Sequence, residues 1–187
     1  SGTDRIAEVA SNLDADFVMN IQGDEPDVKG RMIDDLIESM YDEKEAVVCT
    51  FANKIKSMEE FTDPNAVKVV IDKDSYAMYF SRATIPYIRD ENNNPKSSML
   101  ESTSDTVDTG SNTSFLFLKH LGIYMYRKDF LLRFSRLAIP DIEEIEKLEQ
   151  LRVLSNGYKI KVIVTPYMCE GVDTPEDFER FLGKYRT

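Results

Sequence analysis

The sequence predicts an α/β protein, a three-layer α/β/α sandwich around a mixed, mostly parallel sheet, and two observations lead to that prediction. Stretches with apolar residues at helical spacing alternate with short, continuous apolar runs, which is typical of strands covered by helices on both faces. The 187 residues are 42% hydrophobic and 30% charged, the composition of an ordinary globular domain. Because no repeat or linker-like stretch divides the chain, we expect one domain over residues 1–187.

The first part of the chain predicts two pairs of a helix followed by a strand. A helix is expected after Thr3, its predicted N-cap, from apolar residues at helical spacing: Ile6, Val9, Ala10 and Leu13. Residues 16–22 then form a short apolar run that predicts a buried strand. A second helix is predicted over residues 28–40, and a second buried strand over residues 46–51.

The middle of the chain predicts a β-hairpin and a polar insert. Two strand-like runs, 66–71 and 76–80, flank the turn-like residues 72–75, so an antiparallel pair is expected within the sheet. Residues 90–114 are rich in Asn, Ser, Thr and Asp and contain few apolar side chains. Such a stretch has little surface to bury, and we predict a mobile surface insert.

The last part predicts a strand over residues 115–126, a helix over residues 142–154 and a strand over residues 159–165. The helix has an apolar stripe along one face: Ile142, Ile145, Leu148 and Leu151. Asn156-Gly157 is typical of a C-cap that ends it. Thr174 and Pro175 fit the N-cap and the first position of a final helix.

The charge balance limits the classes of partner. The chain has 34 acidic and 23 basic residues and a net charge of -11. We therefore expect no nucleic-acid partner, although a few placed cations or a bound metal still allow a nucleotide. No apolar run reaches the roughly 18 residues that cross a membrane. Cys49 and Cys169 lie in apolar runs without thiol or histidine partners at zinc-ligand spacing, so we predict buried free thiols and a soluble, cytoplasmic protein.

In sheets of this kind, ligands bind beyond the carboxyl ends of the strands, and the polar residues there are the candidates for chemistry. Asp24 follows the strand over 16–22, after Gly23, and its carboxylate suits Mg2+; an Asx-type turn is the competing interpretation. Asp173 stands before the final helix, where helix capping by Thr174 is the competing interpretation.

Other polar residues could bind a polyol or an anion. His120, Gly122 and Tyr124 would face one side of a strand, although a lone strand histidine is commonly just a packed, hydrogen-bonded residue. Arg82 follows another strand and could pair with a carboxylate, or form a surface salt bridge. Glu149-Gln150 lies on the predicted helix 142–154, where a solvated face is the alternative.

Five motifs follow one another along the chain: Asn20-Ile21-Gln22-Gly23-Asp24-Glu25-Pro26, Tyr79-Phe80-Ser81-Arg82-Ala83, His120-Leu121-Gly122-Ile123-Tyr124, Leu148-Glu149-Gln150-Leu151-Arg152 and Gly171-Val172-Asp173-Thr174-Pro175-Glu176-Asp177. In that order they closely resemble the 3-deoxy-manno-octulosonate (Kdo) cytidylyltransferases, or CMP-Kdo synthetases. The resemblance implies a nucleotide-diphospho-sugar transferase-like fold. It also implies an enzyme that joins CMP from CTP to Kdo for lipopolysaccharide biosynthesis, with Mg2+, as a homodimer.

The resemblance also implies roles for individual residues. Asp24 and Asp173 match the metal carboxylates that serve catalysis. Positions expected to line the sugar pocket are matched by Gln22, Arg82, His120, Tyr124, Glu149 and Gln150, with Arg82 expected at the Kdo carboxylate. Ser1 and Gly2 match positions near the cytosine ring.

By the same resemblance, the chain is an N-terminally truncated form. The resemblance implies that the strand and the glycine- and arginine-rich loop with which the family holds the CTP triphosphate are missing from these residues, and it leaves their activity on their own open. Two other functions compete: a CMP-sialic-acid-type synthetase, with the same chemistry and a different sugar pocket, and an inactive fragment that binds a sugar or a metal.

Overall fold

In the computed structural model, residues 2–23, 28–87, 89, 107–108, 114–115, 117–167 and 175–183 are described. The helices are α1 (Gly2–Ala10), α2 (Gly30–Asp42), α3 (Met58–Thr62), α5 (Lys128–Phe134), α6 (Asp141–Glu146), α7 (Gln150–Ser155) and α8 (Pro175–Gly183). The strands are β1 (Phe17–Asn20), β2 (Ala46–Lys54), β3 (Lys68–Ile71), β4 (Ala77–Ser81), β5 (Val107–Asp108), β6 (Ser114–Phe115), β7 (Leu118–Arg127) and β8 (Lys159–Val164).

The main sheet has the strand order β4-β3-β7-β2-β8, with β1 paired to β7 beside this path. The predicted mixed sheet is confirmed. Most of the strands do point in the same direction: one direction is shared by β1, β2, β3 and β8, and the opposite one by β4 and β7. At the level of pairing, the expectation of mostly parallel strands is wrong: only β2–β8 is parallel among the described pairs, because β7 lies between strands that run against it.

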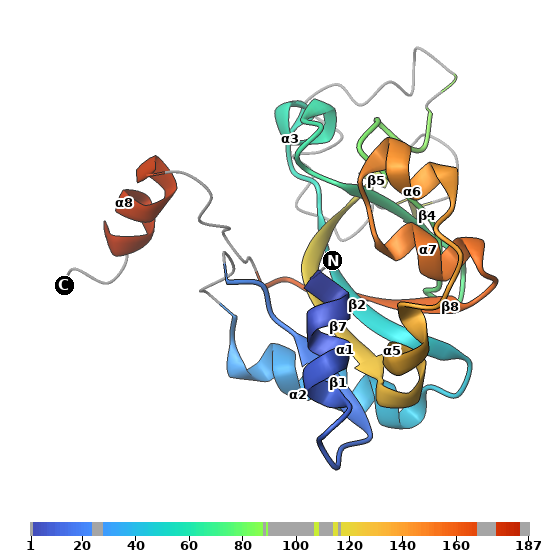
Figure 1. Ribbon diagram of the computed structural model, residues 1–187. Coiled ribbons are helices and arrows are strands. Elements are labelled where there is room, and N and C mark those ends of the chain that lie inside the picture. Colours follow the sequence, from blue (N-terminus) through green and yellow to red (C-terminus); the bar gives the residue numbers. More distant parts are fainter. Residues whose placement is uncertain are drawn as a thin grey trace.

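Helices lie on both faces of the sheet (Figure 1), and the apolar core on each face confirms the three layers. On one face, α2 packs its side chains Met32, Leu36 and Met40 against β2 and β7. On the other face, α1, α5 and α7 contribute to a larger core. The sheet contributes to both cores because successive strand residues point to opposite faces, as Tyr124 and Met125 do on β7.

Two helix predictions need correction. Helix α1 begins at Gly2, so Thr3 is buried inside its first turn and does not cap it. The buried side of α1 carries small residues, Thr3, Ala7 and Ala10, while Val9 and Leu13 are exposed. The single helix expected over 142–154 is two helices, α6 and α7, because Lys147 adopts a left-handed conformation with φ 55° between them.

Other expectations about local structure are confirmed. Strands β3 and β4 form the predicted antiparallel hairpin. Gly157 has a positive φ of 78° after α7, as a C-cap glycine requires. Pro175 is the first residue of α8.

The polar insert lies mostly outside the described residues. Within residues 90–114, β5 is described and pairs antiparallel with β6, and mobility of the insert stays a prediction. Cys49 is a buried free thiol, and burial raises its pKa to about 11, whereas Cys169 lies outside the described residues. None of the described helices combines the length and apolar character that crossing a bilayer needs.

Candidate active site

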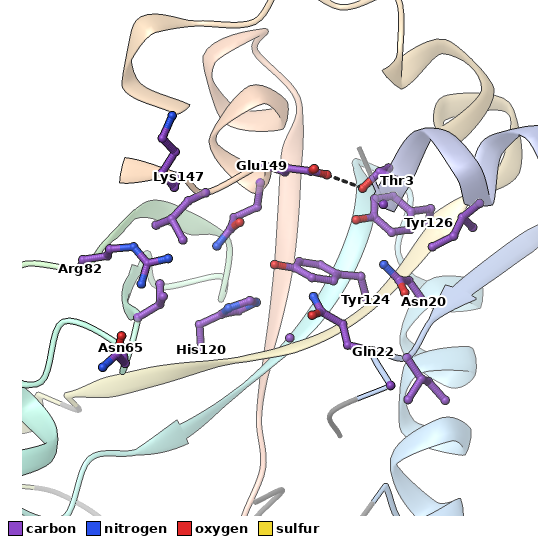
Figure 2. Close-up of a pocket in the computed structure, with 18 residues that line it drawn as sticks. Thr3, Asn20, Gln22, Asn65, Arg82, His120, Tyr124, Tyr126, Lys147 and Glu149 are labelled. Carbon is purple, nitrogen blue, oxygen red and sulfur yellow. Dashed lines mark hydrogen bonds between the residues drawn. The ribbon is translucent and has the colours of Figure 1, made fainter. Parts of the chain in front are cut away.

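A cavity of about 750 Å³ lies where β7 is left without a strand neighbour along one edge (Figure 2). β1 pairs with residues 124–127 of β7, and β3 pairs with residues 118–119 on the same edge. The carboxyl end of β1 and the start of β3 therefore face each other across the gap. The rest of the wall comes from α1 and from the corner between α6 and α7.

All six residues predicted for the sugar pocket line this one cavity, although they come from four separate parts of the chain. Gln22 follows β1, Arg82 follows β4, and His120 and Tyr124 lie on β7, while Glu149 and Gln150 stand at the α6–α7 corner. Gly2, predicted near the nucleotide base, also lines it. The folding of distant motifs into one cavity is what a binding site requires; the role of each residue is a separate question.

The predicted metal residues cannot be placed in the same way. Asp24 and Asp173 lie outside the described residues, as does Ser1. Within the described part of the chain, no group of three or more His, Cys, Asp or Glu side chains is arranged to hold a metal ion. Gly23, the residue before Asp24, lines the cavity.

Arg82 is held in place by two backbone carbonyls. Its Nε donates to the Glu146 carbonyl at 2.8 Å, and its Nη1 donates to the Pro64 carbonyl at 3.0 Å. Among the described residues, Nη2 has no hydrogen-bond partner and the guanidinium forms no ion pair within 4 Å. A guanidinium has five N–H donors, so three remain for a ligand. The charge of Arg82 is thus fixed in position and still available.

The carboxylate of Glu146 secures the backbone at the same corner. It accepts from the Ser81 hydroxyl at 2.6 Å, from the Arg82 backbone N–H at 2.9 Å and from the Tyr79 hydroxyl at 3.3 Å. Burial alone would raise the pKa of Glu146, but the hydrogen bonds from Arg82, Ser81 and Tyr79 outweigh it and lower the pKa. Glu146 therefore stays ionised and joins the end of β4 to the end of α6.

The aromatic wall of the cavity is uncharged at neutral pH. Burial lowers the pKa of His120 to about 3, so its imidazole is neutral. Burial also raises the pKa of Tyr124 well above its usual range, so its hydroxyl keeps the proton. The two rings are in contact, with their centroids 5.2 Å apart. This wall can offer hydrogen bonds without a charge that would compete with Arg82.

Glu149 is tied to the first helix, as Figure 2 shows by its dashed line. The Thr3 hydroxyl donates to Glu149 Oε2 at 2.6 Å. This explains why Thr3 is buried rather than at a helix cap. It also means that the α6–α7 corner is attached to α1.

Sequence reasoning missed several other lining residues: Thr3, Asn20, Asn65, Tyr126 and Lys147. Asn20 is the first residue of the motif that contains Gln22, and its place at the end of β1 could have been used. Lys147 gave no signal, because a left-handed lysine cannot be identified from its neighbours. Lys147 adds a second cation to Arg82, against one carboxylate, Glu149, among the described lining residues. The described lining residues thus carry one more positive than negative side chain, in a chain of net charge -11.

The chain is similar to members of a known protein family. The family described as cytidylyltransferase matches residues 1–160. A 3-deoxy-manno-octulosonate cytidylyltransferase of Geotalea uraniireducens (strain Rf4) is 44% identical, over 100% of this chain and 70% of its own length. A protein of the same name from Fusobacterium nucleatum is 43% identical, over 98% of this chain and 66% of its own length.

A solved structure of CMP:2-keto-3-deoxy-manno-octonic acid synthetase in complex with CTP superposes with a TM-score of 0.82 at 35% identity. The superposition includes 99% of this chain and 68% of the solved chain. HddC from Yersinia pseudotuberculosis, at 14% identity and a TM-score of 0.57, shares the fold alone. With its sequence matched along almost the whole length and its fold matched as well, the chain belongs to the 3-deoxy-manno-octulosonate cytidylyltransferase family.

Proposed function

We propose that the protein activates Kdo by transferring CMP to it from CTP, as a step of lipopolysaccharide biosynthesis. The anomeric hydroxyl of the sugar attacks the α-phosphorus of CTP and loses its proton. The bond from that phosphorus to the bridging oxygen breaks, and pyrophosphate leaves. CMP-Kdo and pyrophosphate are the products.

One observation from the cavity carries this proposal: a fixed, unpaired guanidinium shares a wall with neutral hydrogen-bonding groups. Arg82 offers a cation to the sugar's carboxylate, and the two carbonyls on its Nε and Nη1 stop it from turning away. His120, Tyr124 and Gln150 offer neutral polar groups to hydroxyls. An acidic polyol has both kinds of group, and the relatives are named for such a substrate.

We also propose that Asp24 and Asp173 hold Mg2+. The donor chemistry fits, since magnesium prefers carboxylate oxygens together with water and phosphate. When bound, the ion neutralises phosphate charge and helps to orient the attacking and leaving groups. Within the chain itself, Arg82 and Lys147 would hold anionic groups, while the corner at Glu149 and Gln150 would position the sugar for attack.

A CMP-sialic-acid-type synthetase is the nearest alternative, because sialic acid is also an acidic polyol. The names of the relatives favour Kdo. An inactive fragment that binds a sugar or a metal is the alternative of a different class. Turnover with CTP separates it from either enzyme.

The substitution Arg82→Lys tests the proposed contact with the sugar carboxylate. Lysine keeps the charge, but it cannot make both carbonyl hydrogen bonds of Arg82 and still offer two parallel N–H groups. A charge-assisted hydrogen bond is worth about 1.5–3 kcal/mol, so we expect KM for Kdo to rise about 10- to 100-fold. KM for CTP should change much less.

The matched control is Arg133→Lys, because Arg133 lies on α5 in an exposed ion pair with Asp129. That variant should leave both KM values unchanged. If Arg82→Lys changes neither KM, or raises both equally, Arg82 is not the residue that recognises the sugar carboxylate.

A further inference from the structure

A β-bulge shapes the wall of the cavity. Thr50 of β2 pairs with Tyr124 of β7, and the next residue, Phe51, pairs with Leu121, so β7 has two extra residues at this point. Bulges re-aim side chains and are common beside active sites. Here the extra residues are Gly122 and Ile123, and Gly122 lines the cavity.

The Thr50 side chain, fully buried behind this wall, contacts three polar groups. Its Oγ1 lies 2.8 Å from the Ile123 carbonyl oxygen, 3.2 Å from the Leu121 carbonyl oxygen and 2.9 Å from Nε2 of His120. A hydroxyl has one proton, and carbonyl oxygens can only accept. The proton must therefore point toward the carbonyls. The oxygen lone pair then faces His120, and Nε2 must carry an N–H to meet it.

The second nitrogen of the ring follows from the first. Burial keeps the His120 imidazole neutral, so it has one N–H, and with that proton on Nε2 the Nδ1 atom has a free lone pair. Nδ1 has no hydrogen bond to any residue in the described part of the chain. The ring is held by edge-to-face contact with Phe80, at 5.1 Å and 81°, and it lines the cavity.

We propose that Thr50 is a positioning residue that fixes His120 as the Nε2–H tautomer, so that Nδ1 accepts a hydrogen bond from a sugar hydroxyl. The occupant is taken to be the acidic sugar of the proposed function. Nδ1 in this form repels a carboxylate or phosphate oxygen, whereas the Arg82 guanidinium attracts one. The two side chains therefore set the orientation of the bound sugar, with a hydroxyl at His120 and the carboxylate at Arg82.

The tautomer can be measured directly because the sequence has a single histidine. In the untagged protein labelled with 15N-histidine, a long-range 1H–15N correlation spectrum reports both ring nitrogens of His120. At pH 7.5 we expect a protonated-type shift at Nε2 and an unprotonated-type shift at Nδ1, with Nδ1 moving on addition of Kdo. A protonated Nδ1, or a doubly protonated ring, in the wild-type protein overturns the proposal. The proposal is also overturned if the Nδ1 chemical shift does not change when Kdo is added at a concentration that saturates turnover.

Two variants of Thr50 connect the tautomer to substrate binding. Thr50→Val keeps the shape and removes the acceptor for Nε2–H, so the tautomer pattern should change and KM for Kdo should rise about 5- to 10-fold, with little effect on KM for CTP. Thr50→Ser retains the hydroxyl and should keep the wild-type tautomer and KM. A Thr50→Val protein with the wild-type spectrum and KM contradicts the proposal. If Thr50→Val does not fold, Thr50→Ser and the wild-type spectrum still decide it.

The outcomes of this experiment distinguish a failure of the inference from a failure of the proposed function. The tautomer is read without substrate, so a Nε2–H ring in a protein that does not turn over Kdo would contradict the proposed function and the hydrogen bond to the sugar. The assignment of Thr50 as the residue that sets the tautomer would stand. A Nδ1–H ring in a protein that makes CMP-Kdo would contradict the inference alone.

Discussion

The buried ion pair between Glu143 and Arg152 offers a test of how the active-site corner is held. Arg152 Nε donates to Glu143 Oε2 at 2.8 Å, Nη2 bonds the other carboxylate oxygen, and the side chains are only 6% and 9% exposed. The guanidinium also lies over the Phe134 ring, 4.5 Å from its centroid. Glu143 is on α6 and Arg152 on α7, so the pair closes the corner that carries Glu149.

The substitution Arg152→Met should be severe. Methionine retains apolar contact with Phe134, but it leaves the Glu143 carboxylate buried without its partner, which costs about 3–5 kcal/mol. Domains of this size have total stabilities of roughly 5–15 kcal/mol. The melting temperature should therefore fall by roughly 10 °C. Because the corner also loosens, KM for Kdo should rise in the folded fraction.

Urea unfolding followed by circular dichroism at pH 7.5 measures this loss. The control is Arg133→Met, since Arg133 and Asp129 form an ion pair whose side chains are 58% and 81% exposed, and such pairs contribute about 0–1 kcal/mol. In the double variant Glu143→Leu/Arg152→Met no charge is left unpaired, so much of the stability should return. If Arg152→Met costs no more than Arg133→Met, the pair does not hold the corner.

Three further predictions concern single residues. The pKa of His120 is about 6.5 in the unfolded chain and about 3 in the folded protein, so the unfolded state binds an extra proton as the pH falls and the folded state loses stability. Between pH 7 and pH 5, the free energy of unfolding of the wild-type protein should therefore fall by about 2 kcal/mol more than that of His120→Gln. Urea unfolding at the two pH values measures this difference. Equal losses would show that His120 is not buried as a neutral ring. Lys147→Gly should be about 1 kcal/mol more stable to urea than Lys147→Ala, because only glycine relieves the positive φ; no difference would contradict that. Asp24→Asn should lower kcat strongly with little effect on stability, and an unchanged kcat at saturating Mg2+ would remove Asp24 from the metal site.

The helix over residues 142–154 shows where periodicity fails. The apolar stripe predicted that Ile145 faces the core, but its side chain is 77% exposed. Leu148 and Leu151 of the stripe are buried as predicted, but Glu143 and Arg152 are buried as well, because their pairing satisfies two charges that sequence periodicity assigns to solvent. No glycine or proline marks the break at Lys147. The break itself matters, because it turns Glu149 toward the cavity.

Location was easier to predict than contact. The rule that ligands bind beyond the carboxyl ends of strands indicated the neighbourhoods of Gln22 and Arg82, and both line the cavity. The place of Thr50 behind His120 could not be predicted in this way. It stands in an apolar run, and its contacts depend on a bulge in β7 that the sequence of β2 does not reveal.

The central claim is that this cavity serves CMP transfer to an acidic sugar, and one measurement tests it most directly. The protein is incubated with CTP and Mg2+ and with either Kdo or sialic acid, while pyrophosphate release and the CMP-sugar product are followed. We expect CMP-Kdo with one pyrophosphate per sugar, and a kcat/KM for Kdo well above that for sialic acid. A preference for sialic acid, or no CMP-sugar from either one, would contradict the account.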